Sequence, residues 1–258
     1  MRRPLLVANW KMNKNQRQAR NFAESLLAIL APETAASAEL AIAPPFTCLE
    51  TLGTSLGDSR VDLAGQDVCA EEDGAFTGEV SPRMLADLGC RYCIVGHSER
   101  RALFGETGEH VAAKATALLR AGLSPIVCVG ETQGEREAGK TEEIVARQLE
   151  TSLPRLKTPT AADLVVAYEP IWAIGTGVTA TPEQAQEVHE LLRDRLRQML
   201  GEGAEEVRLQ YGGSVGPANI QALMAQPDID GALIGGASLD PESFASIVAK
   251  TELENTTP

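Results

Sequence analysis

The sequence predicts an α/β protein, because short apolar segments alternate with helical patterns along the whole chain. Each segment is almost continuously apolar or small, which is typical of parallel strands that are covered on both faces. The segments recur about every 30 residues, the spacing of repeated strand–helix units. The expected strands are Leu5–Ala8, Leu40–Ala43, Val61–Ala64, Cys93–Val95, Ile126–Val129, Leu164–Ala167, Val207–Leu209 and Ala232–Ile234.

Helical patterns fill the intervals between these strands. Apolar residues recur three or four positions apart, as they do on the buried face of an amphipathic helix. The clearest stripes are Phe22, Leu26 and Leu30; Val111, Ala115, Leu118 and Leu119; and Ala185, Val188, Leu192, Leu196 and Met199. Helix starts are marked by a capping residue followed by proline, in Ser81-Pro82, Thr181-Pro182 and Asp240-Pro241. Eight alternations fit both a closed barrel and an open doubly wound sheet, and the pattern alone does not choose between them.

No linker or change of composition divides the sequence. We therefore expect one domain over residues 1–258, with a frayed polar tail at 251–258. Hydrophobic residues make up 43% of the 258 residues, which is enough for a large core, and the formal net charge is −13. This charge argues against nucleic-acid and anionic-membrane partners, whose phosphates would be repelled. A bound anion would need a locally positive site.

The sequence carries no sign of secretion or membrane insertion. The apolar Leu5–Ala8 follows two arginines but is interrupted by Asn9, short of the ~7 to 15 residues of a signal peptide. No stretch approaches the ~20 apolar residues of a membrane span. The five cysteines are an odd number, and Cys90 and Cys93 lie where a strand begins. We interpret this pair as packing residues rather than as zinc ligands or a redox pair, in a cytoplasmic protein.

Function in α/β proteins lies at the carboxyl ends of the strands. Lys11, His97 and Glu169 each follow an expected strand, and the glycine pairs Gly212-Gly213 and Gly235-Gly236 follow two others. Each alone has a simpler explanation: a solvated lysine, a structural histidine, a capping glutamate, or a chain reversal. Together they supply a cation, an electrophile, a base and an anion-binding turn on one face, which predicts an active site.

Five segments resemble the signature segments of the triosephosphate isomerase family, in the family's order and across the whole chain. They are Ala8–Asn13, Gly96–Arg101, Ala167–Gly177, Tyr211–Val215 and Leu233–Leu239. The resemblance implies a single closed (β/α)₈ TIM barrel, eight parallel strands surrounded by helices. It also implies the interconversion of dihydroxyacetone phosphate and glyceraldehyde 3-phosphate in glycolysis and gluconeogenesis, with no metal or other cofactor.

The resemblance also assigns roles to residues. Glu169 would be the base, and His97 a neutral proton donor at the start of a short helix formed by Ser98–Ala102. Lys11, with Asn9 nearby, would stabilise the enediolate, and Glu99 would be a buried carboxylate beside the site. The phosphate would bind to main-chain N–H groups, with a short helix after the eighth strand pointing at it. The residues implied there are Gly175, Ser214, Gly235 and Gly236.

Two loops carry further expectations from the resemblance. Pro170–Trp172 and Val178–Ala180 would flank a mobile lid, although Val178 departs from the lysine that is common there, and a rigid surface loop is the alternative. The segment Gly74–Val80 would join two chains into a homodimer, with Thr77 beside Asn9 and Lys11 of the partner. The alternative is a surface loop whose Phe76 packs on its own barrel.

Competing functions are also open. Gly134–Thr141 matches the G-x-x-x-x-G-K-[ST] pattern of a nucleotide-binding P-loop. Against that interpretation, Gly130–Gln133 intervenes after the preceding strand, and two glutamates would lie among the phosphates. The simpler alternative is a polar loop from which Lys140 and Thr141 begin a helix. A non-catalytic phosphosugar-binding barrel, or another barrel isomerase or aldolase, is the second rival.

Overall fold

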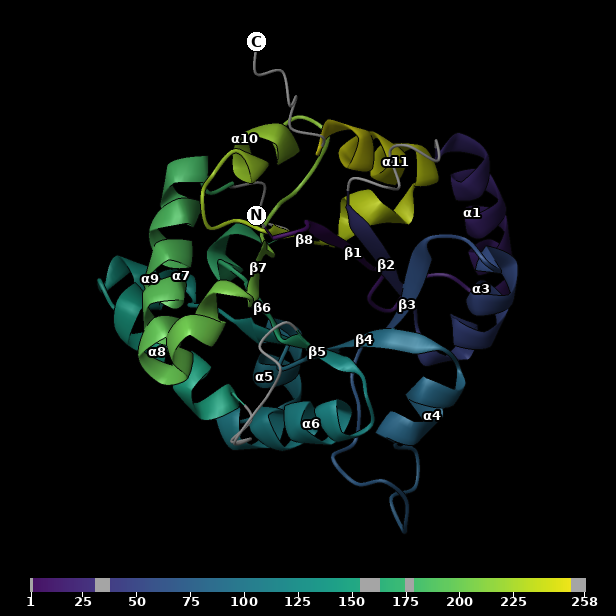
Figure 1. Ribbon diagram of the computed structural model, residues 1–258, viewed down its shortest axis with the longest axis horizontal. Coiled ribbons are helices and arrows are strands. Elements are labelled where there is room, and N and C mark those ends of the chain that lie inside the picture. The colour runs from purple at the N-terminus through teal and green to yellow at the C-terminus, as the bar shows by residue number, and fades with distance from the viewer. Residues whose placement is uncertain (1, 31–37, 154–162, 175–178, 252–258) are drawn as a thin grey trace.

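The computed structural model describes residues 2–30, 38–153, 163–174 and 179–251. Its eight strands form a closed, all-parallel barrel in which each strand pairs with the next and β1 pairs with β8. Figure 1 shows the strands as an inner ring surrounded by helices. The strands are β1 (Leu5–Asn9), β2 (Glu39–Ala43), β3 (Val61–Gly65), β4 (Cys90–Val95), β5 (Ser124–Val129), β6 (Val165–Tyr168), β7 (Arg208–Tyr211) and β8 (Gly231–Ile234).

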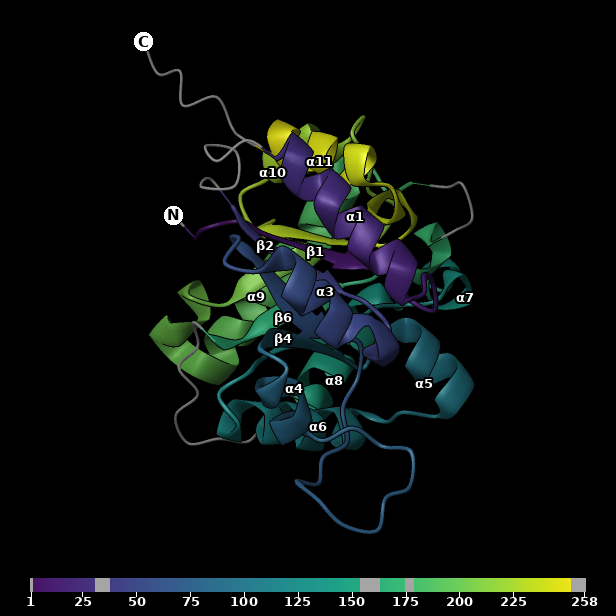
Figure 2. The same ribbon diagram turned by 90° about the vertical axis from the view of Figure 1, so that its right-hand side faces the viewer.

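The helices lie outside the strands and cover their outer faces (Figures 1 and 2). The α-helices are α1 (Gln16–Ile29), α3 (Leu49–Leu56), α4 (Pro82–Asp87), α5 (Ser98–Phe104), α6 (Gly108–Arg120), α7 (Gln133–Glu137), α8 (Thr141–Ser152), α9 (Pro182–Leu200), α10 (Ile220–Met224) and α11 (Pro241–Lys250). Short 3-10 helices are η1 (Phe46–Cys48), η3 (Ile171–Ala173), η4 (Gly201–Glu205) and η5 (Gly236–Leu239). The expected α/β alternation and the closed barrel are both confirmed.

The hydrophobic core has two layers, because alternate residues of each strand point to opposite faces. One cluster consists only of strand residues, including Leu5, Val7 and Ile94, and fills the barrel interior. The second and larger cluster joins the outward-facing strand residues to the helices, as Leu6 and Phe22 illustrate. The low aromatic content suits this arrangement, since small and branched side chains fill the interior.

All eight expected strands are present, but the seventh was predicted incorrectly. We expected an apolar segment at Val207–Leu209, whereas β7 runs from Arg208 to Tyr211. Arg208 and Gln210 are buried and alternate with outward-facing residues. Arg208 is tolerated because its guanidinium lies 2.8 Å from Glu39 Oε2, which offsets the cost of burying its charge. A local apolar pattern cannot show that partner.

The predicted helix starts are confirmed in detail. Thr181 caps α9 with Pro182 in its first turn and Gln184 completing a capping box. Ser81 and Asp240 cap α4 and α11 with their side chains, and a proline follows each, but neither start has a capping box. Two expectations were wrong, one at the end of α9 and one directly after α11.

Met199 was expected on the buried stripe of α9 but is 40% exposed, whereas Leu196 on the same stripe is fully buried and Leu200 packs against the core. Thr251 was expected in a frayed tail but is buried, and its hydroxyl donates to the carbonyl of Ile247 at 2.8 Å. The remainder of that tail, 252–258, lies outside the described residues.

Candidate active site

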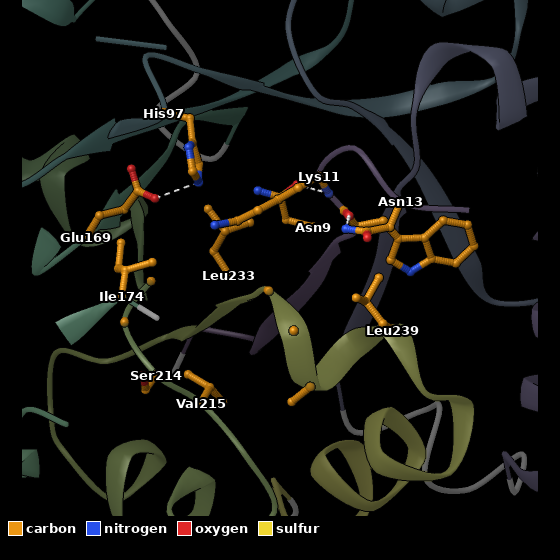
Figure 3. A pocket seen from close by; sticks show the side chains of 16 residues that line it. Asn9, Lys11, Asn13, His97, Glu169, Ile174, Ser214, Val215, Leu233 and Leu239 are labelled. Atoms are coloured by element: carbon orange, nitrogen blue, oxygen red, sulfur yellow. Dashed lines mark hydrogen bonds and ion pairs between the residues drawn. The ribbon is translucent and has the colours of Figure 1, made fainter. Parts of the chain in front are cut away.

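A pocket of about 340 Å³ opens at the carboxyl ends of the strands. Figure 3 shows the side chains of Lys11, His97 and Glu169 turned towards it from three different strand ends. Asn9, Ser214 and both glycines of the Gly235-Gly236 pair also line it. The structure thus brings together the residues that the sequence places far apart, because every strand of a parallel barrel ends on the same side.

Glu169 and His97 form a buried pair at the centre of this pocket. Glu169 follows β6 and is 1% exposed, and its Oε1 lies 2.8 Å from His97 Nε2. The other carboxylate oxygen accepts a hydrogen bond from the main-chain N–H of Ser98 at 2.8 Å. Burial alone would raise the pKa of Glu169, but the His97 ring, through its hydrogen bond and through its charge whenever it is protonated, and the Ser98 N–H hold that pKa below its usual value. The carboxylate is therefore ionised near neutral pH.

His97 is placed by a sharp turn between β4 and α5. Gly96 has φ +68°, and a Cβ there would lie 2.7 Å from Val111 Cγ2, so only glycine fits this turn without strain. His97 then becomes the N-cap of α5, and its Nδ1 accepts from the Glu99 N–H at 3.2 Å. An accepting Nδ1 carries no proton, which places the single proton of the neutral ring on Nε2, facing Glu169.

The short helix expected after His97 is confirmed as α5. A helix N-terminus that holds the ring neutral would lower the pKa of His97, whereas here the pKa is raised. Burial is the largest single influence and lowers the pKa of His97, but the charge and hydrogen bond of Glu169 together with the charge of Glu99 outweigh it, so the net shift is upward. The ring is neutral in this arrangement because Nδ1 accepts a hydrogen bond from the Glu99 N–H. That hydrogen bond must break before Nδ1 can bind a second proton.

Lys11 is held at the rim of the pocket by a strained main chain. Its φ is +51°, which is unusual for a residue with a side chain. Its N–H donates to Asn9 Oδ1 at 3.1 Å and its carbonyl accepts from Gln66 Nε2 at 2.8 Å. These contacts hold a conformation that costs about 1–3 kcal/mol in isolation. The Lys11 ammonium lies 2.7 Å from Glu99 Oε1.

Glu99 was expected to be a buried carboxylate, and this is wrong for the single chain. Its side chain is 47% exposed. Glu99 is the second residue of α5, and it extends from the rim of the barrel towards Lys11 rather than into the interior. The predicted contact with the site therefore exists, but the predicted burial does not.

The expected phosphate-binding residues are partly described. Ser214, Gly235 and Gly236 line the pocket opposite His97, and η5 begins directly after Gly235. The short helix predicted after the eighth strand is thus present, as a 3-10 helix. Gly175 and Val178, which carry parts of the predicted phosphate site and lid, lie outside the described residues.

Comparison with known proteins agrees with this geometry. The sequence model of the family described as triosephosphate isomerase matches residues 4–251. A triosephosphate isomerase of Moorella thermoacetica is 55% identical over 248 residues, covering 96% of this chain and 98% of the relative. Those of Citrifermentans bemidjiense and Symbiobacterium thermophilum are 50% and 52% identical, covering 98% and 96% of this chain and 100% and 97% of the relatives.

This chain belongs to the triosephosphate isomerase family. The predicted resemblance is therefore confirmed, and with it the assignment to the isomerases. Within the described part of the chain, no helix combines the length and apolar character that crossing a membrane requires.

The structure contradicts the nucleotide-binding alternative for residues 134–141. Gly134 and Glu135 lie inside α7 rather than in a loop that leaves a strand. Lys140 immediately precedes α8, which begins at Thr141 and buries Ile144, Val145 and Leu149. The simpler interpretation of Lys140 and Thr141 as a helix start is confirmed, except that the loop before them is itself partly helical.

Glu131 is a residue of this site that the sequence analysis missed. It is fully buried, and its Oε1 accepts from the Tyr168 hydroxyl at 3.1 Å and from Trp172 Nε1 at 2.9 Å. Glu131 thereby holds the residues on both sides of Glu169. It follows β5 by two positions, so the rule that identified Glu169 at a strand end would also have found it.

The segment Gly74–Val80 follows β3 and projects beyond the body of the barrel, below α4 in Figure 2. Phe76 in this segment is 47% exposed, which contradicts the alternative in which it packs on its own barrel. Met12, Leu103 and Phe104 are also large, apolar and more than half exposed, at 94%, 76% and 68%. Leu103 and Phe104 of α5, like Met12, lie close in sequence to residues of the site.

Proposed function

We propose that this chain interconverts dihydroxyacetone phosphate and D-glyceraldehyde 3-phosphate by proton transfer through an enediolate, in cytoplasmic glycolysis and gluconeogenesis. The observation that carries the proposal is the convergence of Lys11, His97 and Glu169 on one pocket in a chain of this family. A base, a proton donor and a cation around about 340 Å³ are the groups that an aldose–ketose isomerisation needs. The scheme uses no cofactor.

Glu169 is the proposed base. Its depressed pKa keeps it ionised, and its burial means that few water molecules compete for its oxygens. Proton abstraction from the carbon beside the substrate carbonyl requires one of these oxygens to leave its present partner, the Ser98 N–H or His97. These partners lower the pKa of Glu169 and so weaken it as a base; once an oxygen leaves them, the burial of the carboxylate raises its basicity.

His97 is the proposed proton donor to the substrate oxygens. The neutral tautomer with Nε2–H presents its proton to the pocket, where it can move to a carbonyl oxygen as negative charge develops there. Lys11 places a cation at the same rim, with Asn9 as a polar contact and Glu99 orienting the ammonium. Ser214, Gly235 and Gly236 supply the proposed phosphate site, together with Gly175.

We propose further that the active form is a homodimer joined through Gly74–Val80. The exposed Phe76, Met12 and Leu103 would bury apolar surface on a second copy, which favours association. Thr77 of the partner would then cover Lys11 and Glu99, whose side chains are 29% and 47% exposed in the single chain. The partner loop would position the lysine without taking part in the chemistry.

A coupled assay on purified protein, following the conversion of glyceraldehyde 3-phosphate, tests the activity directly. Glu169→Asp retracts the carboxylate by one methylene, and a displacement of about 1 Å can cost about 10²-fold in turnover. We expect that loss in kcat with an unchanged affinity for inorganic phosphate. Wild-type turnover in Glu169→Asp would exclude Glu169 as the base.

The dimer is tested by replacing Ala75–Glu79 with a short Gly-Ser turn. We expect a folded monomer of low activity, because Lys11 would lose its cover. Sedimentation and kcat are measured on the same sample. A fully active monomer, or a variant that remains dimeric, would contradict the proposed role of this loop.

A further inference from the structure

α9 contributes a histidine to the interior that the proposed chemistry does not use. His189 is fully buried, and its Nδ1 lies 2.7 Å from the carbonyl oxygen of Ala185, one turn earlier in the helix. Its ring meets Tyr168 edge-to-face, with centroids 5.7 Å apart and an interplanar angle of 84°. The same ring lies 6.4 Å from Tyr211, tilted by 40°. One side chain of α9 therefore contacts the final residues of two strands.

The imidazole of His189 acts as a neutral aromatic ring. Burial lowers its pKa, and the opposing main-chain groups of Ala185 and Gln210 do not reverse that shift. A neutral ring that donates from Nδ1 to the Ala185 carbonyl is fixed in its plane. A ring of fixed orientation can support an edge-to-face contact, which depends on the angle between the two planes.

The two tyrosines occupy equivalent positions in neighbouring strands. Tyr168 ends β6, Tyr211 ends β7, and the two are register partners. Both belong to the outer core layer, which faces the helices. Residues alternate between the two faces along a strand, so the residue after each tyrosine lies on the inner face. Those residues are Glu169 and Gly212, which line the active-site pocket.

Tyr168 is immobilised by three sets of contacts. His189 contacts its ring, Glu131 accepts its hydroxyl hydrogen bond at 3.1 Å, and its carbonyl accepts from the Gly212 N–H at 2.7 Å. Gly212 also lies close to the Glu169 side chain, because a Cβ added at Gly212 would come within 3.0 Å of Glu169 Cγ. A small displacement of Tyr168 is therefore transmitted to Glu169.

We propose that His189 is a positioning residue of the isomerase site: its ring fixes Tyr168 and Tyr211 from the outer face of the barrel, and so fixes Glu169 against the Gly212–Ser214 turn. It touches no substrate, and its effect is transmitted through Tyr168. The inference rests on the proposed role of Glu169 as base. Displacements on the order of 1 Å at a catalytic group can cost about 10²-fold, and a packing shift smaller than that should cost about tenfold.

Two substitutions separate the ring from its hydrogen bond. His189→Asn keeps a donor near the Ala185 carbonyl but removes the ring, whereas His189→Phe keeps the ring and removes the donor. Leu192→Ala provides the control, because Leu192 is fully buried one turn further along α9. It loosens the same helix without removing the ring that contacts the tyrosines.

The measurements are kcat, KM and the inhibition constant of inorganic phosphate, taken well below the unfolding temperature of each variant. We expect His189→Asn to lose about tenfold in kcat while its phosphate affinity stays within about twofold. His189→Phe should retain kcat within about threefold, and Leu192→Ala should lower stability without selectively lowering kcat.

Wild-type kcat in folded His189→Asn would overturn the proposal. So would an equal fall in kcat and phosphate affinity, or a fall in Leu192→Ala as large as that in His189→Asn, because either result would indicate general loosening. Glu169→Asp, measured alongside, separates the two levels of the argument. Full activity of Glu169→Asp would contradict the role of Glu169 as base. Loss of activity in Glu169→Asp together with wild-type activity in His189→Asn would contradict only the positioning role of His189.

Discussion

The two ends of the barrel both bury charged side chains, but they do so in different ways. At the amino-terminal end, Arg193 is fully buried and donates to Asp230 at 2.8 Å and to the Val207 carbonyl at 2.7 Å. Arg208 and Tyr92 both contact Glu39 there, at 2.8 and 2.5 Å. At the mouth, Glu169 and His97 pair chiefly with each other and face an open pocket.

This difference indicates how one fold separates stability from chemistry. A buried charge held by several fixed partners is costly to leave unpaired, so substitutions in such a network should lower stability. A buried charge whose partner is itself titratable can exchange a proton with a third group that enters the pocket. Substitutions at the two ends should therefore affect different measurements.

Glu169→Gln at the mouth should have the largest effect on catalysis. Removing a general base typically costs about 10²–10⁴-fold, so kcat should fall by that order. The melting temperature should stay close to that of the wild type, because the amide can still accept from the Ser98 N–H. The coupled assay and thermal unfolding are measured on one preparation. A large loss of stability with little loss of kcat would reverse the comparison.

Arg193→Met at the amino-terminal end should show the opposite pattern. Removing one partner from a buried ion pair costs about 3–5 kcal/mol, and the loss here should lie towards the lower end because Asp230 keeps Arg2 at 2.7 Å. kcat per folded molecule should not change. Denaturant unfolding measures the loss, and Arg197→Met is the control, because the ion pairs of Arg197 are exposed and screened by solvent, so their loss should change stability little. Equal losses of stability in the two variants would show that the buried ion pairs of Arg193 contribute no more than the exposed pairs of Arg197.

Glu39→Gln sharpens the comparison through pH. Burial raises the pKa of Glu39, but hydrogen bonds from Tyr92 and Arg208 outweigh it, so the net shift is downward. A folded pKa below the unfolded one gives stability above roughly pH 4.3, which is lost as the pH falls through the folded pKa. The wild type should therefore lose its advantage over Glu39→Gln on acidification. Unfolding curves from pH 7 to 3 test this, and parallel curves would contradict it.

Lys140→Ala should have the smallest effect. The residue lies on the outside at the start of α8, away from both charged regions, and we expect kcat within a few-fold of the wild type and stability within about 0.5 kcal/mol. The same assay and unfolding measurements apply. Abolished activity would show that this segment takes part in the site after all.

The sequence alone was sufficient for the strand–helix alternation, because parallel strands covered on both faces are apolar throughout and helices carry capping signals such as Thr181-Pro182. It also located Lys11, His97 and Glu169, since each follows a recognisable strand. Periodicity did not distinguish a closed barrel from an open sheet, because both have the same local pattern. That distinction came from the family resemblance, and it is confirmed by the pairing of β1 with β8.

Other features were decided only by the tertiary structure, because they depend on partners that are distant in the sequence. Arg208 can be buried in a strand because it forms an ion pair with Glu39 on another strand. Glu99 was predicted to be buried, but burial depends on what covers the residue, and it lies at the rim of the single chain. The contacts of Glu131 and His189 come from Tyr168, Trp172 and Tyr211 on other elements, so no local pattern shows their roles, although the position of Glu131 after β5 marks it as a candidate. Sequence records which groups are available, whereas packing determines which of them meet and what each contact costs.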